Sequence, residues 1–259
     1  MKYFGGCDVG STYTKTVILD ENGAIVAANT IKSKINSAQS AKAGLDQAIA
    51  DAGLKEIFDL TYLIGTGYGR NKVPQADENI SEISCHAMGV HVTDPSVRAI
   101  IDIGGQDVKG IAVDTDGTVK TFAMNDKCAA GTGRFFESMA NAFEMSLEEF
   151  SKLSLTAENV IPITAQCTVF AESEVVSLVA DNTAPEDIIH GLNASVAGKT
   201  SSLVKRLGGE PAYIMTGGVA QNQGVVKELS DKLGAQVYVP KEAQLCGAIG
   251  AALLAFGER

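Results

Sequence analysis

Tryptophan is absent from the sequence, other aromatic residues are scarce, and no run of basic residues occurs anywhere along its 259 positions. Aromatic residues make up 6% and charged residues 20%, and the formal net charge is −10. A surface of this sign repels phosphate backbones and anionic headgroups. We therefore expect neither nucleic acid nor a membrane as a partner.

Long apolar runs are missing as well. None approaches the roughly 20 residues of a membrane-spanning helix, and the first residues lack the apolar stretch of a signal peptide. We therefore expect a cytoplasmic protein. Hydrophobic residues nevertheless make up 45%, and the 27 glycines gather in short motifs. Such a chain predicts an α/β protein with tight loops, built as one large domain or two lobes.

Paired cysteine motifs are also lacking. None of the five cysteines belongs to a Cys-x-x-Cys motif. An odd number of cysteines in a cytoplasmic chain argues against a disulfide framework. Spacing alone therefore indicates no complete metal site within one chain.

An internal duplication organises the chain. Asp8–Gly23 aligns without a gap with Asp102–Gly117, with identities at Asp8/Asp102, Gly10/Gly104, Lys15/Lys109, Asp20/Asp114 and Gly23/Gly117. Each copy reads as a strand that ends in Asp-x-Gly, a second strand, and an Asn-Gly or Asp-Gly turn that opens a third strand. The repeated β-hairpins predict two lobes of like topology.

The rest of the sequence alternates helix and strand. Asn79 and Glu82 form a possible capping box, which predicts a helix start at Asn79. We predict helices over 37–52, 132–143, 168–180, 186–207 and 243–256, and strands over 61–65, 161–164, 212–216 and 236–239. We place the first lobe at 1–95 and the second at 96–242, with the last helix (243–259) packed back on the first lobe.

The duplicated turns suit phosphate binding. Glycine lets backbone N–H groups approach anionic oxygens, while hydroxyl groups and lysine add donors and positive charge. The candidate binding residues are Gly10, Ser11, Thr12, Tyr13, Thr14 and Lys15 in the first copy, and Gly104 and Gly105 in the second. Asp8 and Asp102 repel phosphate and instead suit hydrated Mg²⁺. Gln106 or Asp107 could orient an attacking water.

A third glycine motif, Met215–Asn222, stands at a predicted strand-to-helix junction. Gly217 and Gly218 there permit close approach of a flat adenosine, and Gln221 and Gln244 complete the candidate nucleotide-binding residues. Any one glycine motif alone is equally well an ordinary turn, but the three together favour nucleotide binding. The chain has no Gly-x-x-x-x-Gly-Lys-Ser/Thr motif, which excludes a P-loop NTPase. Gly65–Gly69 is interpreted as a turn.

Two phosphate hairpins, one in each lobe, and a Gly-Gly adenosine motif resemble the actin/Hsp70/sugar-kinase ATPase superfamily. The resemblance covers essentially the whole chain. It implies a two-lobed α/β fold with duplicated β-hairpin phosphate loops and with ATP or ADP in the cleft between the lobes.

Two cysteines, Cys128 and Cys167, stand where a non-helical segment leads into a predicted helix. A helix N-terminus favours a thiolate. Two thiolates cannot complete a four-cysteine iron–sulfur cluster, whereas a twofold dimer would supply four. The residues alone leave two alternatives open. The cysteines could be buried small hydrophobes, the usual fate of free cysteine, or could bind structural zinc across a dimer.

The motifs around these cysteines carry a more specific resemblance. They are similar to motifs of the activators of 2-hydroxyacyl-CoA dehydratases and of the related ATPase subunits of benzoyl-CoA reductase, and comprise Ser81–Gly89, Asp102–Asp107, Asn125–Phe135 and Gln166–Glu174. The resemblance implies a homodimer with one [4Fe–4S] cluster, held by Cys128 and Cys167 of each chain. Cys7, Cys85 and Cys246 are then core residues.

The same resemblance implies Mg²⁺-dependent ATP hydrolysis that drives an electron from ferredoxin or flavodoxin into a partner iron–sulfur enzyme. The partner could be a 2-hydroxyacyl-CoA dehydratase, a benzoyl-CoA-type reductase or a double-cubane cluster protein. The main alternative is a small-molecule kinase of the same fold, which would have no use for the two cysteines. A chaperone or cytoskeletal ATPase would need room for a peptide-binding domain or filament contacts.

Overall fold

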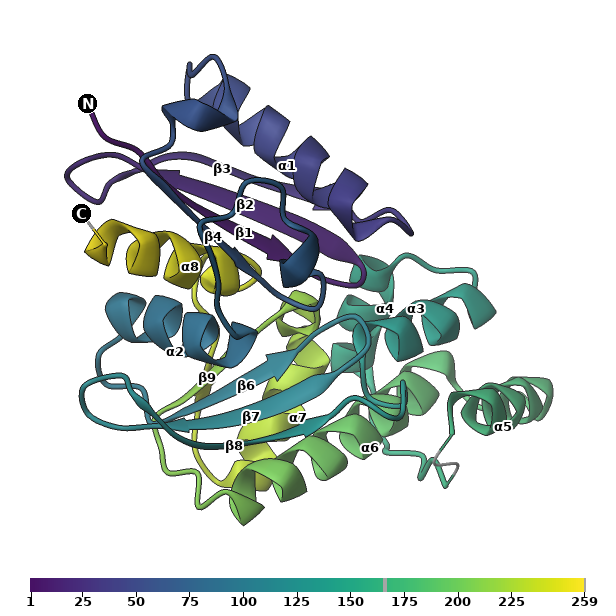
Figure 1. Ribbon diagram of the computed structural model, residues 1–259. Coiled ribbons are helices and arrows are strands. Elements are labelled where there is room, and N and C mark those ends of the chain that lie inside the picture. Colours follow the sequence, from purple (N-terminus) through teal and green to yellow (C-terminus); the bar gives the residue numbers. More distant parts are fainter. Residues whose placement is uncertain (165–166, 259) are drawn as a thin grey trace. The chain divides into compact units, whose positions relative to one another are not determined.

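The computed structural model describes residues 1–164 and 167–258 (Figure 1). Over these residues the strands form a pair of five-stranded sheets, ordered β3-β2-β1-β4-β5 and β10-β9-β6-β7-β8. The first sheet consists of β1 (Phe4–Val9), β2 (Tyr13–Leu19), β3 (Ile25–Lys32), β4 (Tyr62–Thr66) and β5 (Glu78–Asn79). The second consists of β6 (Ala99–Ile103), β7 (Val108–Val113), β8 (Val119–Asn125), β9 (Tyr213–Thr216) and β10 (Val237–Tyr238).

The two sheets have the same topology, which confirms the predicted duplication. In each, the first strand pairs antiparallel with the second and parallel with the fourth. The register places Asp8 opposite Lys15 and Thr66, and Asp102 opposite Lys109 and Thr216. Equivalent residues therefore stand at the carboxyl ends of equivalent strands.

The described residues divide into two compact units, each built on one sheet. Unit 1 comprises Met1–Val97, Val113–Lys120 and Lys241–Arg259, and unit 2 comprises Arg98–Ala112 and Thr121–Pro240. The segment 113–120, which was predicted to lie in the second lobe, belongs to unit 1. Within that unit Gly117, with φ +83°, lies against the ring of His91.

The helices of unit 1 are α1 (Ser37–Asp51), α2 (Glu82–Thr93) and α8 (Cys246–Gly257), with short 3-10 turns η1 (Ile57–Asp59) and η2 (Arg70–Lys72). Glycine lets these helices approach closely. A side chain on Gly6 of β1 would collide with the backbone of α8, and Gly89 of α2 and Gly250 of α8 leave no room for side chains between those two helices. The alanines of α8 complete a core with Phe4, Val17, Leu19 and Ile64.

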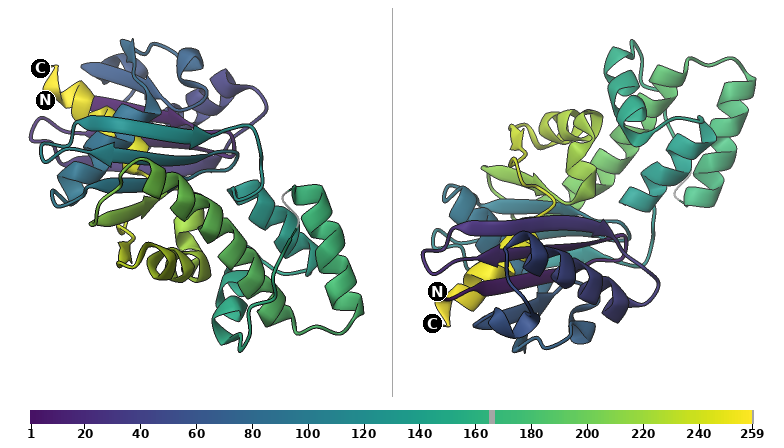
Figure 2. Two further views of the ribbon diagram at one scale, coloured as in Figure 1. Left: turned by 90° about the horizontal axis from the view of Figure 1, so that it is seen from below. Right: turned by 90° about the horizontal axis from the view of Figure 1, so that it is seen from above.

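The helices of unit 2 are α3 (Gly133–Ala142), α4 (Leu147–Leu153), α5 (Thr168–Ala180), α6 (Pro185–Arg206) and α7 (Gln223–Leu233), with 3-10 turns η3 (Ser154–Thr156) and η4 (Gly218–Gln221). Figure 2 shows α3, α4 and α5, in teal to green, gathered at one end of this unit. Helix α6 runs from that group to the second sheet, where Gly110 of β7 lies against Leu203 and Leu207. No helix in the described part of the chain is long and apolar enough to cross a membrane.

Three local predictions are wrong. Helix α2 begins at Glu82 with Ser81 as its cap, because Asn79 is taken up in β5. Residues 161–164 form no strand, since backbone N–H groups there donate to the Asp187 carbonyl and the Glu174 carboxylate instead of to a neighbouring strand. Helix α8 begins at Cys246 rather than at 243, because residues 241–245 form a turn.

Candidate functional site

The first predicted phosphate loop is the turn between β1 and β2. Asp8, the last residue but one of the buried β1, is 5% exposed, and its Oδ2 accepts a hydrogen bond from Lys15 Nζ at 3.0 Å. The turn closes where the Gly10 N–H donates to the Tyr13 carbonyl at 3.1 Å. A Cβ on Gly10 would lie 2.7 Å from that carbonyl oxygen. Glycine is therefore required for the turn that carries the Asp8–Lys15 pair.

The hydroxyl groups of this turn differ in their partners. Thr14 is fully buried, and its hydroxyl shares a hydrogen bond of 2.9 Å with Ser33. Tyr13 is exposed and Ser11 is half-buried. Thr12 Oγ1, by contrast, is buried and has no hydrogen-bond partner among the described residues. A buried polar atom without a partner is costly, so Thr12 fits an incoming phosphate oxygen.

The second predicted loop, between β6 and β7, repeats this arrangement with a buried charge cluster. Lys109 is 4% exposed, and its Nζ lies 3.3 Å from Asp102 Oδ2 and 2.8 Å from Asp107 Oδ1. The Gly104 N–H donates to the Asp107 carbonyl at 3.0 Å, while Gln106 is exposed. Lys109 is not among the site residues predicted from the sequence, yet its charge offsets those of two predicted carboxylates, Asp102 and Asp107.

Two glycine turns pack directly on the aspartates. Gly67 follows β4 and Gly217 follows β9, each with φ +85°. A side chain on Gly67 would collide with Asp8 Oδ1, and one on Gly217 would lie 2.8 Å from Asp102 Oδ1. Residues 67–69 form a turn, as predicted, whereas Gly65 and Thr66 belong to β4, and the contact of Gly67 with Asp8 was missed. The available signal was a Thr-Gly pair that follows an apolar strand in both copies.

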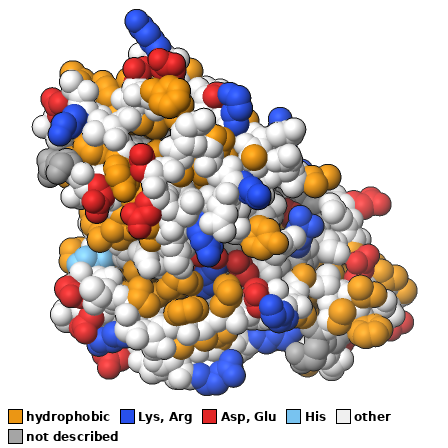
Figure 3. Space-filling model, in the orientation of Figure 1, with side chains coloured by type: hydrophobic (Ala, Val, Ile, Leu, Met, Phe, Trp, Pro, Cys, Tyr) orange, Lys and Arg blue, Asp and Glu red, His pale blue; other side chains and the backbone are white. Residues whose placement is uncertain are grey.

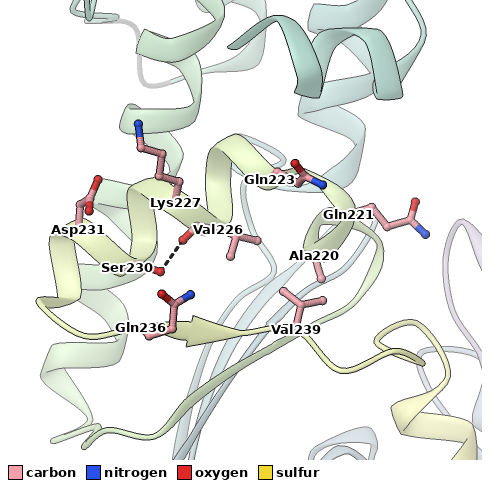
Figure 4. Close-up of a pocket in the computed structure, with 9 residues that line it drawn as sticks. All are labelled: Ala220, Gln221, Gln223, Val226, Lys227, Ser230, Asp231, Gln236 and Val239. Carbon is pink, nitrogen blue, oxygen red and sulfur yellow. Dashed lines mark hydrogen bonds between the residues drawn. The ribbon is translucent and has the colours of Figure 1, made fainter. Parts of the chain in front are cut away.

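The Gly217-Gly218 motif leads through η4 into α7. Beside it lies an open hollow of about 450 Å³, lined by Ala220, Gln221, Gln223, Val226, Lys227, Ser230, Asp231, Gln236 and Val239. In Figure 4, Ala220 and Val239 lie at one end of this hollow, and Ser230 and Gln236 at the other. Of the predicted nucleotide-binding residues, Gln221 lines it. Gln244 belongs to unit 1, in the turn before α8.

The five cysteines fall into two classes. Cys7, Cys85 and Cys246 are buried, which confirms their assignment to the core, whereas Cys128 and Cys167 are exposed. Burial raises the pKa of Cys7 and of Cys85 to about 12, so these thiols stay protonated near neutral pH. The alternative that Cys128 and Cys167 are buried hydrophobes is wrong for this chain.

The two exposed cysteines precede helices that pack together. Cys167 holds the cap position of α5 in extended conformation, and Cys128 lies between β8 and α3. Gln166, which begins the second cysteine motif, lies outside the described residues. Helix α3 contacts α5, and the Ser138 hydroxyl donates to the Glu172 carboxylate at 3.0 Å. The structure thus brings both cysteine-bearing segments into one helical group of unit 2.

Helix α5 presents an apolar surface. Hydrophobic side chains gather over this helix in Figure 3. The large hydrophobic side chains of α5 that are exposed are Val169, Phe170, Val176 and Val179. Within the described ranges, no three His, Cys, Asp or Glu side chains are grouped so that they could hold a metal ion. The two exposed thiols fit half of the four-thiolate ligand set of an iron–sulfur cluster.

The paired sheets and duplicated turns define an α/β ATPase fold of the actin and sugar-kinase type, which confirms the predicted fold class. A ROK family glucokinase from Streptomyces griseus shares the fold with a TM-score of 0.60 at 15% identity, over 98% of this chain and 99% of its own. This likeness concerns the fold alone.

The chain belongs to the BadF/BadG/BcrA/BcrD ATPase family, whose family model matches residues 6–255. It is 45% identical over 256 residues to the 2-hydroxyisocaproyl-CoA dehydratase activator of Clostridioides difficile, covering 99% of this chain and 96% of that protein. It is 47% identical over 254 residues to the activator of lactoyl-CoA dehydratase of Anaerotignum propionicum, covering 98% and 97%.

A solved structure agrees with these relatives. The activator of the 2-hydroxyisocaproyl-CoA dehydratase from Clostridium difficile, with bound ADPNP, superposes with a TM-score of 0.94 at 45% identity, over 99% of this chain and 95% of that one. The predicted family resemblance is therefore confirmed, and with it an ATPase. The small-molecule kinase alternative is not favoured.

Thr216 is expected to position Asp102 for ATP hydrolysis. It is fully buried, and its Oγ1 donates a hydrogen bond to Asp102 Oδ1 at 3.0 Å. Thr216→Val keeps the side-chain shape but removes this donor. We expect the unfolding free energy to fall by about 1–3 kcal/mol and the turnover number for ATP to fall about tenfold, roughly 1.4 kcal/mol of transition-state stabilisation. Urea unfolding and steady-state hydrolysis measure the two effects.

Thr66→Val is the matched control for Thr216→Val. Thr66 is also fully buried at the end of its strand, but its hydroxyl donates to the Ile80 carbonyl at 2.9 Å. Both variants should therefore lose stability, while only Thr216→Val should lose turnover. Equal turnover in the two variants would show that Thr216 has a structural role only.

Proposed function

We propose that this protein is an ATP-driven activator that works as a homodimer and passes a low-potential electron to a partner iron–sulfur enzyme. The partner is a dehydratase of 2-hydroxyacyl-CoA compounds or a related reductase, since two relatives that are 45% and 47% identical to this chain are named as activators of such dehydratases. The electron donor is a ferredoxin or flavodoxin, and the protein acts in the cytoplasm.

The observation that carries this proposal is the split between two exposed and three buried cysteines. Cys128 and Cys167 alone are exposed among the five, and they lead into helices that contact each other. Two thiolates per chain require a second chain to complete a [4Fe–4S] cluster. That requirement supports a twofold dimer with the cluster at its interface, where it would supply one-electron redox chemistry.

The residues of the two turns bind and orient the substrate MgATP. Thr12 and Lys15 hold phosphate oxygens, with backbone N–H groups of the glycine turns. Asp8 and Asp102 hold the water shell of Mg²⁺, and Gln106 or Asp107 orients the attacking water. Gly217, Gly218, Gln221 and Gln244 receive the nucleoside. Asp8 and Lys15 form an ion pair in the present structure, so substrate binding must exchange this pair for contacts with phosphate and metal.

Nucleotide and redox state are expected to influence each other in the iron-loaded dimer. If the two sites are coupled, binding at one must bias the other by linkage. We expect a non-hydrolysable ATP analogue to shift the reduction potential, or the rate of iron release to a chelator, relative to ADP. Lys15→Ala should weaken both effects. Anaerobic potentiometry and chelation kinetics measure them.

Lys42→Ala is the charge-matched control, because Lys42 pairs with Asp46 across the exposed face of α1. It should behave as the parent protein does. Identical potentials and identical chelation rates in every nucleotide state would refute the proposed coupling of ATP to electron transfer.

A further inference from the structure

The backbone of the second phosphate loop is bonded directly to the first turn of α3. The Gly133 N–H donates to the Gly104 carbonyl at 2.8 Å, and the Arg134 N–H donates to the Gly105 carbonyl at 3.0 Å. First-turn N–H groups have no partner within their own helix, so these bonds use donors that the helix itself leaves free. A Cβ on Gly133 would lie 3.2 Å from the Gly104 oxygen, which explains why glycine suits this contact.

A closed turn connects this contact to Cys128. Thr132 is fully buried at the cap of α3, and its N–H and its hydroxyl both donate to the Ala129 carbonyl, at 2.9 and 2.7 Å. Ala130, inside the turn, is 5% exposed. The segment between Gly133 and the exposed Cys128 is therefore held by hydrogen bonds at Thr132 and by the burial of Ala130.

The first copy of the duplication offers an internal comparison. There, Ser33 follows β3 and bonds the first loop, with its hydroxyl on the Gly10 carbonyl and its N–H on the Thr12 carbonyl, both at 2.8 Å. The segment after the third strand thus docks on loop carbonyls in both copies. In the first copy it runs straight into α1, whereas in the second it is longer and carries Cys128. The contact with the loop carbonyls is therefore common to both copies of the duplication, whereas the cysteine occurs in the second copy.

We propose that this junction, formed by Gly104, Gly105, Gly133 and Arg134, conveys phosphate occupancy of the second loop to Cys128. Gly133 is the positioning residue, because it allows the loop and the helix to touch. The inference rests on the proposed function, since it requires nucleotide at the loop. It adds the route by which the loop and one cluster ligand move together, within unit 2 alone.

The test uses the full chain with Cys167→Ser, prepared without iron, so that Cys128 is the exposed thiol among the cysteines. Iodoacetamide labelling of Cys128 is followed by peptide mass spectrometry, at fixed pH, with and without ADP or a non-hydrolysable ATP analogue and Mg²⁺. We expect nucleotide to change the labelling rate by about fivefold or more, the lower range of typical site-to-site coupling. Cys7, Cys85 and Cys246 should stay unlabelled because they are buried.

Gly133→Pro is the decisive variant. Proline is tolerated at the first position of a helix and removes the N–H donor. Thr132 already has the extended conformation, φ −104° and ψ 175°, that a following proline requires. We expect the ratio of Cys128 labelling rates with and without nucleotide to fall to about one. Calorimetry should still detect nucleotide binding. Gly133→Ala keeps the N–H but crowds the Gly104 carbonyl, so it should lose a smaller part of the nucleotide effect on Cys128 labelling. It replaces the proline variant as the test if that variant does not fold.

Gly198→Ala is the matched control, because this glycine lies within α6 of the same unit and a Cβ there meets its nearest atom only at 4.0 Å. It should keep the full nucleotide effect. Two results would refute the role of the junction while leaving the ATPase proposal intact. One is an unchanged nucleotide effect on Cys128 labelling in both Gly133 variants. The other is nucleotide binding to the parent without any change in Cys128 labelling. Failure of the parent to bind nucleotide at all would overturn the proposed function and the junction together.

Discussion

Asp102→Asn and Asp8→Asn are each expected to lower the rate of Mg²⁺-dependent ATP hydrolysis by about a hundredfold or more, equivalent to roughly 2.7 kcal/mol of transition-state stabilisation. The amide keeps the shape of the carboxylate but not its charge, so it anchors hydrated Mg²⁺ poorly. Asparagine is the better replacement at 102, because Lys109 is buried there and keeps Asp107 at 2.8 Å as a counter-charge. An alanine would also leave a cavity.

Two further measurements make the aspartate result specific. Iron content should be unchanged in both variants, because neither aspartate is a cluster ligand. Asp46→Asn, at an exposed position on α1, should hydrolyse ATP at the parent rate. Normal hydrolysis in either Asp8→Asn or Asp102→Asn would place the metal site elsewhere.

Loss of either exposed cysteine is expected to abolish iron binding. Protein purified without oxygen should contain about four iron and four sulfide per dimer, and Cys128→Ser or Cys167→Ser alone should reduce both to near zero, since a hydroxyl is a poor substitute for a thiolate ligand. Elemental analysis and visible absorption measure the cluster. Analytical ultracentrifugation on the same samples tests whether the cluster-bearing species is a dimer.

Cys246→Ser is the control for the cysteine variants. Cys246 is buried, and its Sγ contacts the Glu242 carbonyl at 3.5 Å, a bond that a serine hydroxyl can retain. This variant should keep the full iron content. A complete cluster in a monomer, or in either Cys128→Ser or Cys167→Ser, would contradict the shared site.

Much of the fold could be predicted because the duplication has local signals. The turns at Gly23 and Gly117 follow from Asn-Gly and Asp-Gly pairs, and both glycines have positive φ, +80° and +83°. Helix α5 matches its predicted range, 168–180. These features depend on neighbours in sequence, which a single chain displays.

The missed features depend on distant partners. Gly67 lies against Asp8 only because β4 pairs parallel with β1, and Lys109 balances Asp107 as well as its cross-strand neighbour Asp102. The false strand at 161–164 has the same origin, since its backbone is bonded to residues of α5 and α6 that follow it. Sequence patterns predict each strand or turn, but not which partner it meets.

Unit 1 combines segments that are far apart in the sequence, and this has a consequence for biosynthesis. Its core needs the alanines of α8 over Phe4, Val17, Leu19 and Ile64, and α8 is the last described element to be synthesised. Until residues 246–257 leave the ribosome, the first sheet keeps one apolar face uncovered. Chains generally fold N-terminal domains first. Here the second unit has all its residues before α8, which belongs to the first unit, has been synthesised.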